Sequence, residues 1–300
     1  MKPRCLEGLL LLHLPARPLA INIEMRAISL AYHDVVDGQP SLHSGIRPGA
    51  ALYALTRDRF QQHLVRIEQQ NGAVDVIRSL GSWQDRVPVF LTFDDGALNA
   101  YYAADELESH GWRGHFFVTT NWIGRPEFLD RWQIRELYDR GHVIGSHSCS
   151  HPERMSHLSW NALTKEWSQS CAVLGDILGQ PVHVASVPNG YYSRTVAQAA
   201  AVCGLKVLFT SEATSTSSIT DGCLILGRYL VQRSTRAETA GAIAAGRCWP
   251  RWKQTLFWEG KKALKQVMGE SYLTMRRVSL SIDAKTRGEV HALGRFTDKV

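Results

Sequence analysis

The sequence lacks two features that would decide its class at once, a disulfide framework and a membrane-spanning run. Its six cysteines lie at positions 5, 149, 171, 203, 223 and 248, and none forms a CxxC pair. In a chain of 300 residues this scatter fits a reducing compartment better than an oxidising one. The apolar patch Leu9–Leu12 is too short to cross a bilayer, and Glu7 and His13 flank it. We therefore expect a protein that is cytoplasmic or peripheral at the inner membrane, although the patch leaves secretion open.

The sequence also lacks an excess of acidic residues, and its positive charge is concentrated at one end. The formal net charge is +6, and residues 246–300 carry twelve Lys or Arg against five Asp or Glu, a difference of +7. We expect 236–300 to be a basic helical tail in which 246–277, with its tryptophans, makes peripheral contact with an anionic membrane. No nucleic-acid partner is expected. Residues 1–24 are expected to be an N-terminal extension, because Met25 stands directly before the first convincing strand.

Between 25 and 235 the sequence alternates between short β-rich runs and helical patterns, without an internal repeat. Such alternation predicts parallel strands joined by crossover helices, so we expect one α/β barrel-like domain with a helical C-terminal appendage. Thr56 and Ser159 are expected to cap helices, and Ser211–Thr220 is expected to be a loop. The expected strands are Ala27–His33, Pro88–Phe93, His115–Thr119, His142–Ser146, Val182–Val187, Lys206–Thr210 and Cys223–Leu230.

Two groups of metal-binding side chains directly follow two of these strands. Asp94 and Asp95 come after Phe93, and Gly96 allows the sharp turn that exposes both carboxylates. His147 and His151 follow the strand that ends near Ser146. In parallel α/β folds, chemistry collects at the carboxyl ends of the strands. Carboxylate and imidazole ligands suit a divalent metal such as zinc, and a remaining carboxylate can act as a base, so the pattern indicates metal-assisted hydrolysis.

These motifs resemble those of the polysaccharide deacetylases with the NodB-homology fold, carbohydrate esterase family 4. The hallmark motifs of that family, TFDDG and H-[ST]-x-x-H, are present as Thr92–Gly96 and His147–His151. The resemblance covers roughly residues 26–235 and implies a distorted (β/α)7-type barrel with a divalent metal, most often Zn²⁺. Carried over to this sequence, it implies metal ligation by Asp95, His147 and His151, with Asp94 as the catalytic base.

The arginine and the tyrosine of the family's third motif are absent from this sequence. The third motif, typically R-x-P-Y-G, has Ser186 in place of the arginine that orients the base and Asn189 in place of tyrosine. Arg228 on the last strand is a candidate replacement for that arginine, and an ordinary ion pair is the alternative. The turn Pro188–Gly190 can still offer a backbone N–H to the oxyanion.

The late Leu-x-x-x-His motif, which supplies the general acid in the family, is also missing. No histidine occurs between His183 and His291. In a subgroup of exopolysaccharide deacetylases, resembling those acting on poly-N-acetylglucosamine, an early strand supplies this histidine. Tyr32-His33-Asp34 fits that arrangement, so the resemblance implies that His33 is the general acid.

The resemblance implies a metal-dependent hydrolase that removes N-acetyl groups from an amino-sugar polysaccharide, an oligosaccharide or a lipid-linked precursor. We expect Pro188, Asn189, Gly190, Trp122, Trp132 and Arg228 to line the substrate site, with the tryptophans stacking on sugar rings. One alternative is an allantoinase-like amidohydrolase of the same fold that acts on a small ureide or cyclic amide. Another is a carbohydrate-binding barrel without turnover, although such a module would need neither a base nor a metal.

Overall fold

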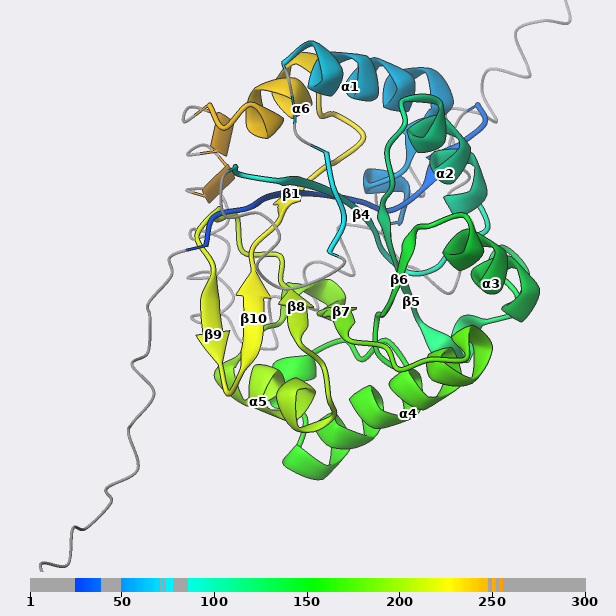
Figure 1. Cartoon of the computed structure of the whole chain (residues 1–300), viewed down its shortest axis with the longest axis vertical. Coiled ribbons are helices and arrows are strands. Elements are labelled where there is room, and N and C mark those ends of the chain that lie inside the picture. Colours follow the sequence, from blue (N-terminus) through cyan, green and yellow to red (C-terminus); the bar gives the residue numbers. More distant parts are fainter. Residues whose placement is uncertain are drawn as a thin grey trace, which may run out of the picture.

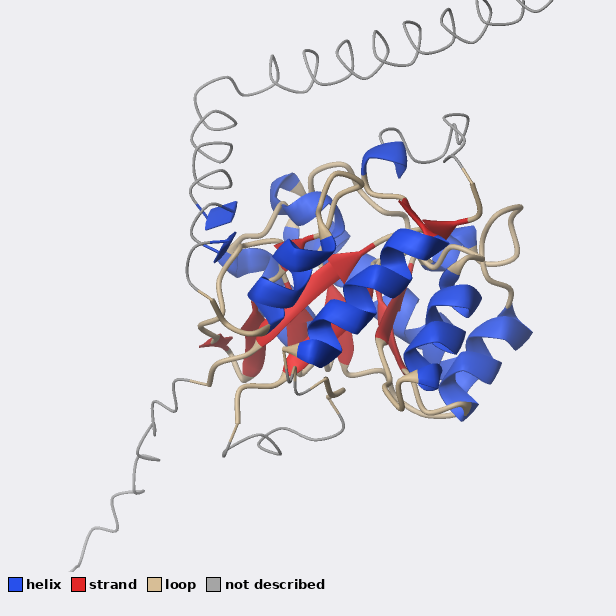
Figure 2. Ribbon diagram, turned by 90° about the horizontal axis from the view of Figure 1, so that it is seen from above, coloured by secondary structure: helices blue, strands red, loops and turns tan. Residues whose placement is uncertain are grey.

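A curled nine-stranded sheet forms the centre of the molecule, and helices cover its outside (Figures 1 and 2). The computed structural model describes residues 25–38, 50–70, 72, 74–77, 86–247, 250–251 and 254–255. All neighbouring strands of this sheet are parallel except β9 and β10. In spatial order the strands are β11 (Tyr229–Leu230), β1 (Ile28–Tyr32), β4 (Val89–Phe93), β5 (His115–Val118), β6 (Val143–Ser146), β7 (Val184–Ser186), β8 (Val207–Phe209), β10 (Cys223–Leu226) and β9 (Ser218–Thr220).

One kinked strand joins the two ends of this sheet. The predicted strand 223–230 is broken at Gly227 and Arg228, so that β10 pairs with β8 while β11 pairs with β1. A Cβ atom on Gly227 would lie 2.4 Å from the carbonyl oxygen of Glu212, so only glycine fits at this close approach. With β10 and β11 counted as one strand and β9 set aside, seven strands form the ring. This confirms the expected distorted (β/α)7-type barrel.

Four of the six described helices begin at a residue whose side chain caps them. The side chains of Thr56, Asp130, Ser159 and Ser193 each accept a hydrogen bond from a backbone N–H in the first turn of the following helix. The six helices among the described residues are α1 (Arg57–Gln69), α2 (Ala100–Ser109), α3 (Arg131–Asp139), α4 (Trp160–Leu178), α5 (Arg194–Val202) and α6 (Ala237–Ala244). Shorter elements are β2 (Val35–Val36), β3 (Leu55–Thr56) and the single 3-10 turns η1 (Ala50–Leu52), η2 (Thr120–Trp122), η3 (Met155–His157) and η4 (Pro188–Gly190).

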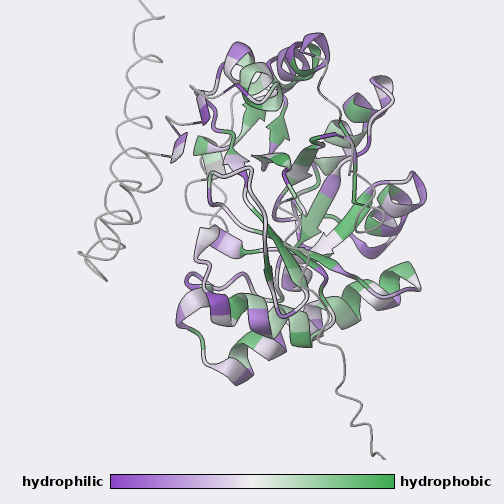
Figure 3. Ribbon diagram, turned by 60° about the vertical axis from the view of Figure 1, so that its left-hand side comes forward, coloured by the Kyte–Doolittle hydropathy of each residue, from purple (hydrophilic) through white to green (hydrophobic). Residues whose placement is uncertain are grey.

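The core lies between the sheet and the helices that cover it, with apolar strands inside and polar helix faces outside (Figure 3). Strands β1 and β4 are buried along their whole length, which is typical of parallel strands that are covered on both faces. A smaller apolar cluster, which includes Phe90, Phe117 and Phe209, fills part of the barrel interior. This packing fixes the strand ends that carry the polar side chains.

The structure corrects two expectations about organisation and adds one helix that the sequence did not predict. Helix α6 belongs to the barrel domain, because Ala240, Ile243 and Ala244 join its core, so the domain does not end at 235. The close approach of α6 to α1 requires a glycine, since a Cβ on Gly241 would lie 2.9 Å from the carbonyl oxygen of Arg66. Part of the expected loop 211–220 forms the antiparallel strand β9, and α5 was not anticipated.

Two of the predicted segments fall mostly or wholly outside the described residues. The extension 1–24 and nearly all of 246–277 are among the undescribed parts, so the predicted membrane contact is not addressed. The described start of the C-terminal segment contacts the barrel, since the Gln254 side chain donates a hydrogen bond to the carbonyl oxygen of Leu230 at 2.7 Å. Within the described ranges, no helix is both long and apolar enough to span a bilayer.

Candidate metal centre and catalytic site

Three of the predicted side chains meet at the carboxyl ends of β4 and β6. Oδ1 of Asp95 lies 3.5 Å from Nε2 of His147 and 3.4 Å from Nε2 of His151. The three candidate ligand atoms all lie within 4.8 Å of one another. Ligand atoms about 2.0–2.1 Å from a tetrahedral zinc ion are separated by roughly 3.4 Å, which is close to the two measured distances. The cluster therefore fits a divalent metal in both ligand type and spacing.

The backbone at this cluster adopts conformations that are rare outside glycine. Asp95, Ser148 and His151 have φ angles of 77°, 65° and 57°, so the two histidines are brought together by a tight loop and not by a helix. Such conformations cost on the order of 1–3 kcal/mol each and persist where the surrounding structure holds them. Two of the three predicted ligands, Asp95 and His151, are among the six described non-glycine residues with positive φ, and such strain is often found at functional sites.

Asp94 lies beside this cluster, and Arg228 holds it in a bidentate pair. The two Nη atoms of Arg228 donate to Oδ1 and Oδ2 of Asp94 at 2.7 and 2.8 Å. Arg228 is 0% exposed and also donates to Oγ1 of Thr92 and to the carbonyl oxygen of Thr210. The prediction that Arg228 contacts substrate is therefore wrong, because its guanidinium is enclosed by protein. It occupies the position relative to Asp94 that the missing arginine was expected to occupy.

Ser186 connects Asp94 to a candidate metal ligand. Its hydroxyl donates to Oδ1 of Asp94 at 3.1 Å and lies 2.6 Å from Nδ1 of His147. A hydroxyl has one proton to donate, so Nδ1 of His147 is the donor in the second contact. Nε2 of His147 then keeps its lone pair and points toward Asp95, as a metal ligand requires. The sequence identified Ser186 only as a departure from the motif, whereas the structure gives it two hydrogen bonds.

Electrostatics keep the site in the protonation states that metal binding needs. Burial opposes ionisation of Asp94, but the charges of Arg228 and His147 outweigh it and lower its pKa to about 2. Burial also opposes ionisation of Asp95, yet the hydrogen bond and charge of His151 lower its pKa well below the usual value. Burial lowers the pKa of His147 to about 4. Both carboxylates are therefore ionised, and His147 is neutral, at pH 7.

His33, the predicted general acid, lies near both aspartates. Its charge acts on the pKa of Asp94 and of Asp95, which places the early-strand histidine within the site. Its ring stacks on Tyr53 with the ring centroids 4.7 Å apart. Tyr53 follows η1, and nothing in its sequence context marked it as part of the site.

The predicted substrate-binding residues differ in their exposure to solvent. Trp122 is only 8% exposed and stacks on His151 with ring centroids 4.9 Å apart, so most of its ring packs inside the protein and its stacking on a sugar stays a prediction. Trp132, in the first turn of α3, is 69% exposed. Within η4, Pro188 is buried and Asn189 is exposed with a φ of 54°. The substrate roles of Trp132 and of Pro188–Gly190 stay predictions.

Replacing the two tryptophans should separate packing from substrate contact. We expect Trp122→Ala to lower the free energy of unfolding by about 3–5 kcal/mol, because a buried indole is removed from its contacts. Trp132→Ala should leave stability unchanged and weaken only the binding of amino-sugar oligosaccharides. Chemical denaturation and isothermal titration measure the two effects. Equal stability of the two variants would contradict this assignment.

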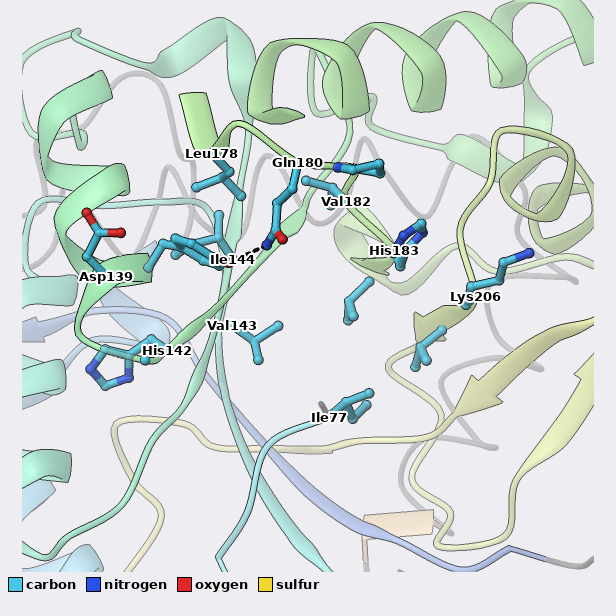
Figure 4. A pocket seen from close by; sticks show the side chains of 15 residues that line it. Ile77, Asp139, His142, Val143, Ile144, Leu178, Gln180, Val182, His183 and Lys206 are labelled. Carbon is cyan, nitrogen blue, oxygen red and sulfur yellow. Dashed lines mark hydrogen bonds between the residues drawn. The ribbon is translucent and has the colours of Figure 1, made fainter. Parts of the chain in front are cut away.

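A separate cavity of about 710 Å³ lies at the opposite end of the barrel (Figure 4). It is lined at the amino ends of β6, β7 and β8, by Val143, Val184 and Val207 among others. Asp94, Asp95, His147 and His151 do not line it. The cavity is therefore distinct from the site at the carboxyl ends of the strands.

Comparisons with known proteins agree with this fold and site. Residues 84–208 match the family model described as polysaccharide deacetylase. The middle of the chain is therefore similar to polysaccharide deacetylases. The matched range includes Asp94, Asp95, His147, His151 and Ser186, and it leaves out the early strand with His33 and the kinked strand with Arg228.

Individual relatives cover part of the chain. The peptidoglycan-N-acetylmuramic acid deacetylase PdaA of Bacillus subtilis is 36% identical over 77 residues, which are 25% of this chain and 27% of that protein. Alignments with three curated relatives span 41%, 60% and 27% of their lengths.

Solved structures show the same fold. The deacetylase PplD of Streptococcus pyogenes superposes with a TM-score of 0.61 at 23% identity and covers 72% of this chain and 96% of that chain. IcaB of Ammonifex degensii superposes with a TM-score of 0.60 at 21% identity, and the match covers 74% of this chain and 97% of that chain. The fold is thus the (β/α) barrel of NodB-type deacetylases.

Proposed function

We propose that the protein is a metal-dependent deacetylase that removes N-acetyl groups from an amino-sugar polysaccharide or oligosaccharide. The observation that carries this proposal is the Asp95–His147–His151 cluster beside a second carboxylate, Asp94, that Arg228 holds in place. A binding module without turnover would need no such second carboxylate. The named relative that acts on peptidoglycan and the neighbour solved with acetate agree with this chemistry.

Asp95, His147 and His151 would hold the metal, which supplies a Lewis acid that polarises the acetyl carbonyl and acidifies a water molecule. Among the described contacts of Asp94, Oδ1 accepts from both Arg228 and Ser186, whereas Oδ2 accepts from Arg228 alone. Oδ2 therefore keeps a lone pair for the proton of the attacking water. His33 would give a proton to the departing amine.

Removal of the metal tests this proposal most directly. We expect the purified protein to release acetate from chito-oligosaccharides and a strong chelator to abolish the release, with recovery on addition of Zn²⁺. Acetate production and metal content measure the two outcomes. If activity appears only on small ureides, the substrate assignment is wrong. Sugar binding without turnover in the zinc-loaded protein would show that it is not an enzyme.

His33→Ala tests the assignment of the general acid. We expect turnover to fall by about 10²–10⁴, because the leaving amine loses its proton donor. Metal content should stay at the wild-type level, since His33 is outside the ligand cluster. His183→Ala is a matched control, because His183 lies at the far cavity. Full activity of the His33 variant would refute the assignment.

A further inference from the structure

A carboxylate outside the metal cluster binds the loop that carries His151. Oε2 of Glu166 accepts hydrogen bonds from the backbone N–H groups of Cys149 and Ser150, at 2.9 and 2.8 Å. Its other oxygen accepts from the hydroxyl of Ser150 at 2.6 Å. Hydrogen bonds to an ionised acceptor are about twice as strong as neutral ones. Three such bonds therefore reach Cys149 and Ser150, two of the three residues between the two histidines.

This loop needs external support because its own backbone is strained. Ser148 and His151, on either side of the residues that Glu166 binds, both have positive φ angles, 65° and 57°. The loop is also bound by η2, where the N–H of Asn121 donates to the carbonyl oxygen of Cys149 at 2.9 Å. Cys149 is thus bound through its N–H by Glu166 and through its carbonyl oxygen by η2.

Helix α4 gives Glu166 a fixed position. The next residue, Trp167, is fully buried, and its indole N–H donates to the carbonyl oxygen of Val196 at 3.3 Å. One turn further along, the hydroxyl of Ser170 accepts from that of Ser146, the residue directly before His147. The core of the domain therefore determines where the carboxylate lies relative to the loop.

We propose that Glu166 is a positioning residue for the metal centre. Its carboxylate holds residues 148–151 in the conformation that places Nε2 of His151 3.4 Å from Asp95. The affinity for the metal then depends on a side chain that does not touch the metal. This inference rests on the proposed metal-dependent function and adds a residue to it.

Glu166→Gln in the full chain tests the proposal. The amide group has one acceptor oxygen, and its NH₂ would face N–H donors, so at least one of the three bonds is lost. We expect the dissociation constant for Zn²⁺, measured by chelator competition, to rise about 10–100-fold, with an altered Co²⁺ absorption spectrum. Far-UV circular dichroism should remain that of the wild type. Asp176→Asn is the matched control, because Asp176 lies on the same helix and pairs with Arg131 at the surface.

A second variant keeps the test decisive if Glu166→Gln does not fold. Ser150 is exposed, and Ser150→Ala removes one of the three bonds and leaves the two backbone donors. We expect it to weaken zinc binding about three- to tenfold. Zinc dissociation constants within twofold of the wild type in every folded variant would overturn the proposal. Failure of the wild-type protein to bind zinc would instead contradict the proposed function itself.

Discussion

Asp94→Asn should reduce acetate release by about 10²–10⁴ while metal content is retained. The amide oxygen cannot take a proton from water at neutral pH, so the variant loses general-base catalysis. Asp94 is not among the three clustered ligands, and its substitution leaves Asp95, His147 and His151 in place. Turnover of chito-oligosaccharides by the zinc-loaded protein is the measurement.

Asp94→Asn should also lower the free energy of unfolding, and this loss would support the pairing of Asp94 with Arg228. Arg228 is fully buried, and its two Nη atoms both donate to Asp94. The asparagine amide would present its NH₂ group to one of these N–H donors, so one hydrogen bond would be lost. Breaking a buried ion pair costs at most about 3–5 kcal/mol, which sets the upper limit of the expected loss. A variant that keeps more than a tenth of the wild-type rate would show that Asp94 is not the base.

Arg228→Met should have the largest effect on folding. It leaves the Asp94 carboxylate buried without its counter-charge, and we expect the free energy of unfolding to fall by about 3–5 kcal/mol. Total stabilities of domains are only about 5–15 kcal/mol, so the variant should unfold at a much lower denaturant concentration. Arg135→Met provides the control, because Arg135 pairs with Asp139 on the exposed face of α3 and should change stability little.

The pH dependence of this loss follows from the pKa of Asp94. Its pKa is about 2 in the folded protein, below the value of about 3.9 in the unfolded chain. Ionised Asp94 therefore contributes stability that is fully present above about pH 4 and is lost as the pH falls toward 2. The difference between the metal-free wild type and Arg228→Met should be largest at neutral pH and shrink below pH 4. A difference that is independent of pH would contradict the ion pair.

The barrel and the ligand cluster were predictable because they depend on local patterns. Short apolar runs that end in Asp94 or His147 place these side chains at one edge of a parallel sheet whatever the details of packing. The cap residues Thr56 and Ser159 likewise indicate where helices begin. These signals lie within a few residues of the elements that they define.

The remaining features depend on contacts between distant parts of the chain. The kink at Gly227 follows from the close approach of Glu212, and the inclusion of α6 in the core follows from the contact of Gly241 with α1. Ser186 was recognised only as a missing arginine, because its hydrogen bonds reach side chains 39 and 92 positions away. Sequence patterns within a single element contain no information about such contacts.

The kinked closing strand makes the ion pair of Asp94 depend on completion of the barrel. Arg228 lies where β10 passes into β11, so the guanidinium reaches Asp94 only when the last strand of the ring has docked between β8 and β1. A chain that ends after β8 contains Asp95, His147 and His151 but lacks Arg228, the counter-charge of Asp94. We therefore expect a chain truncated after β8 to release no acetate even if zinc is supplied.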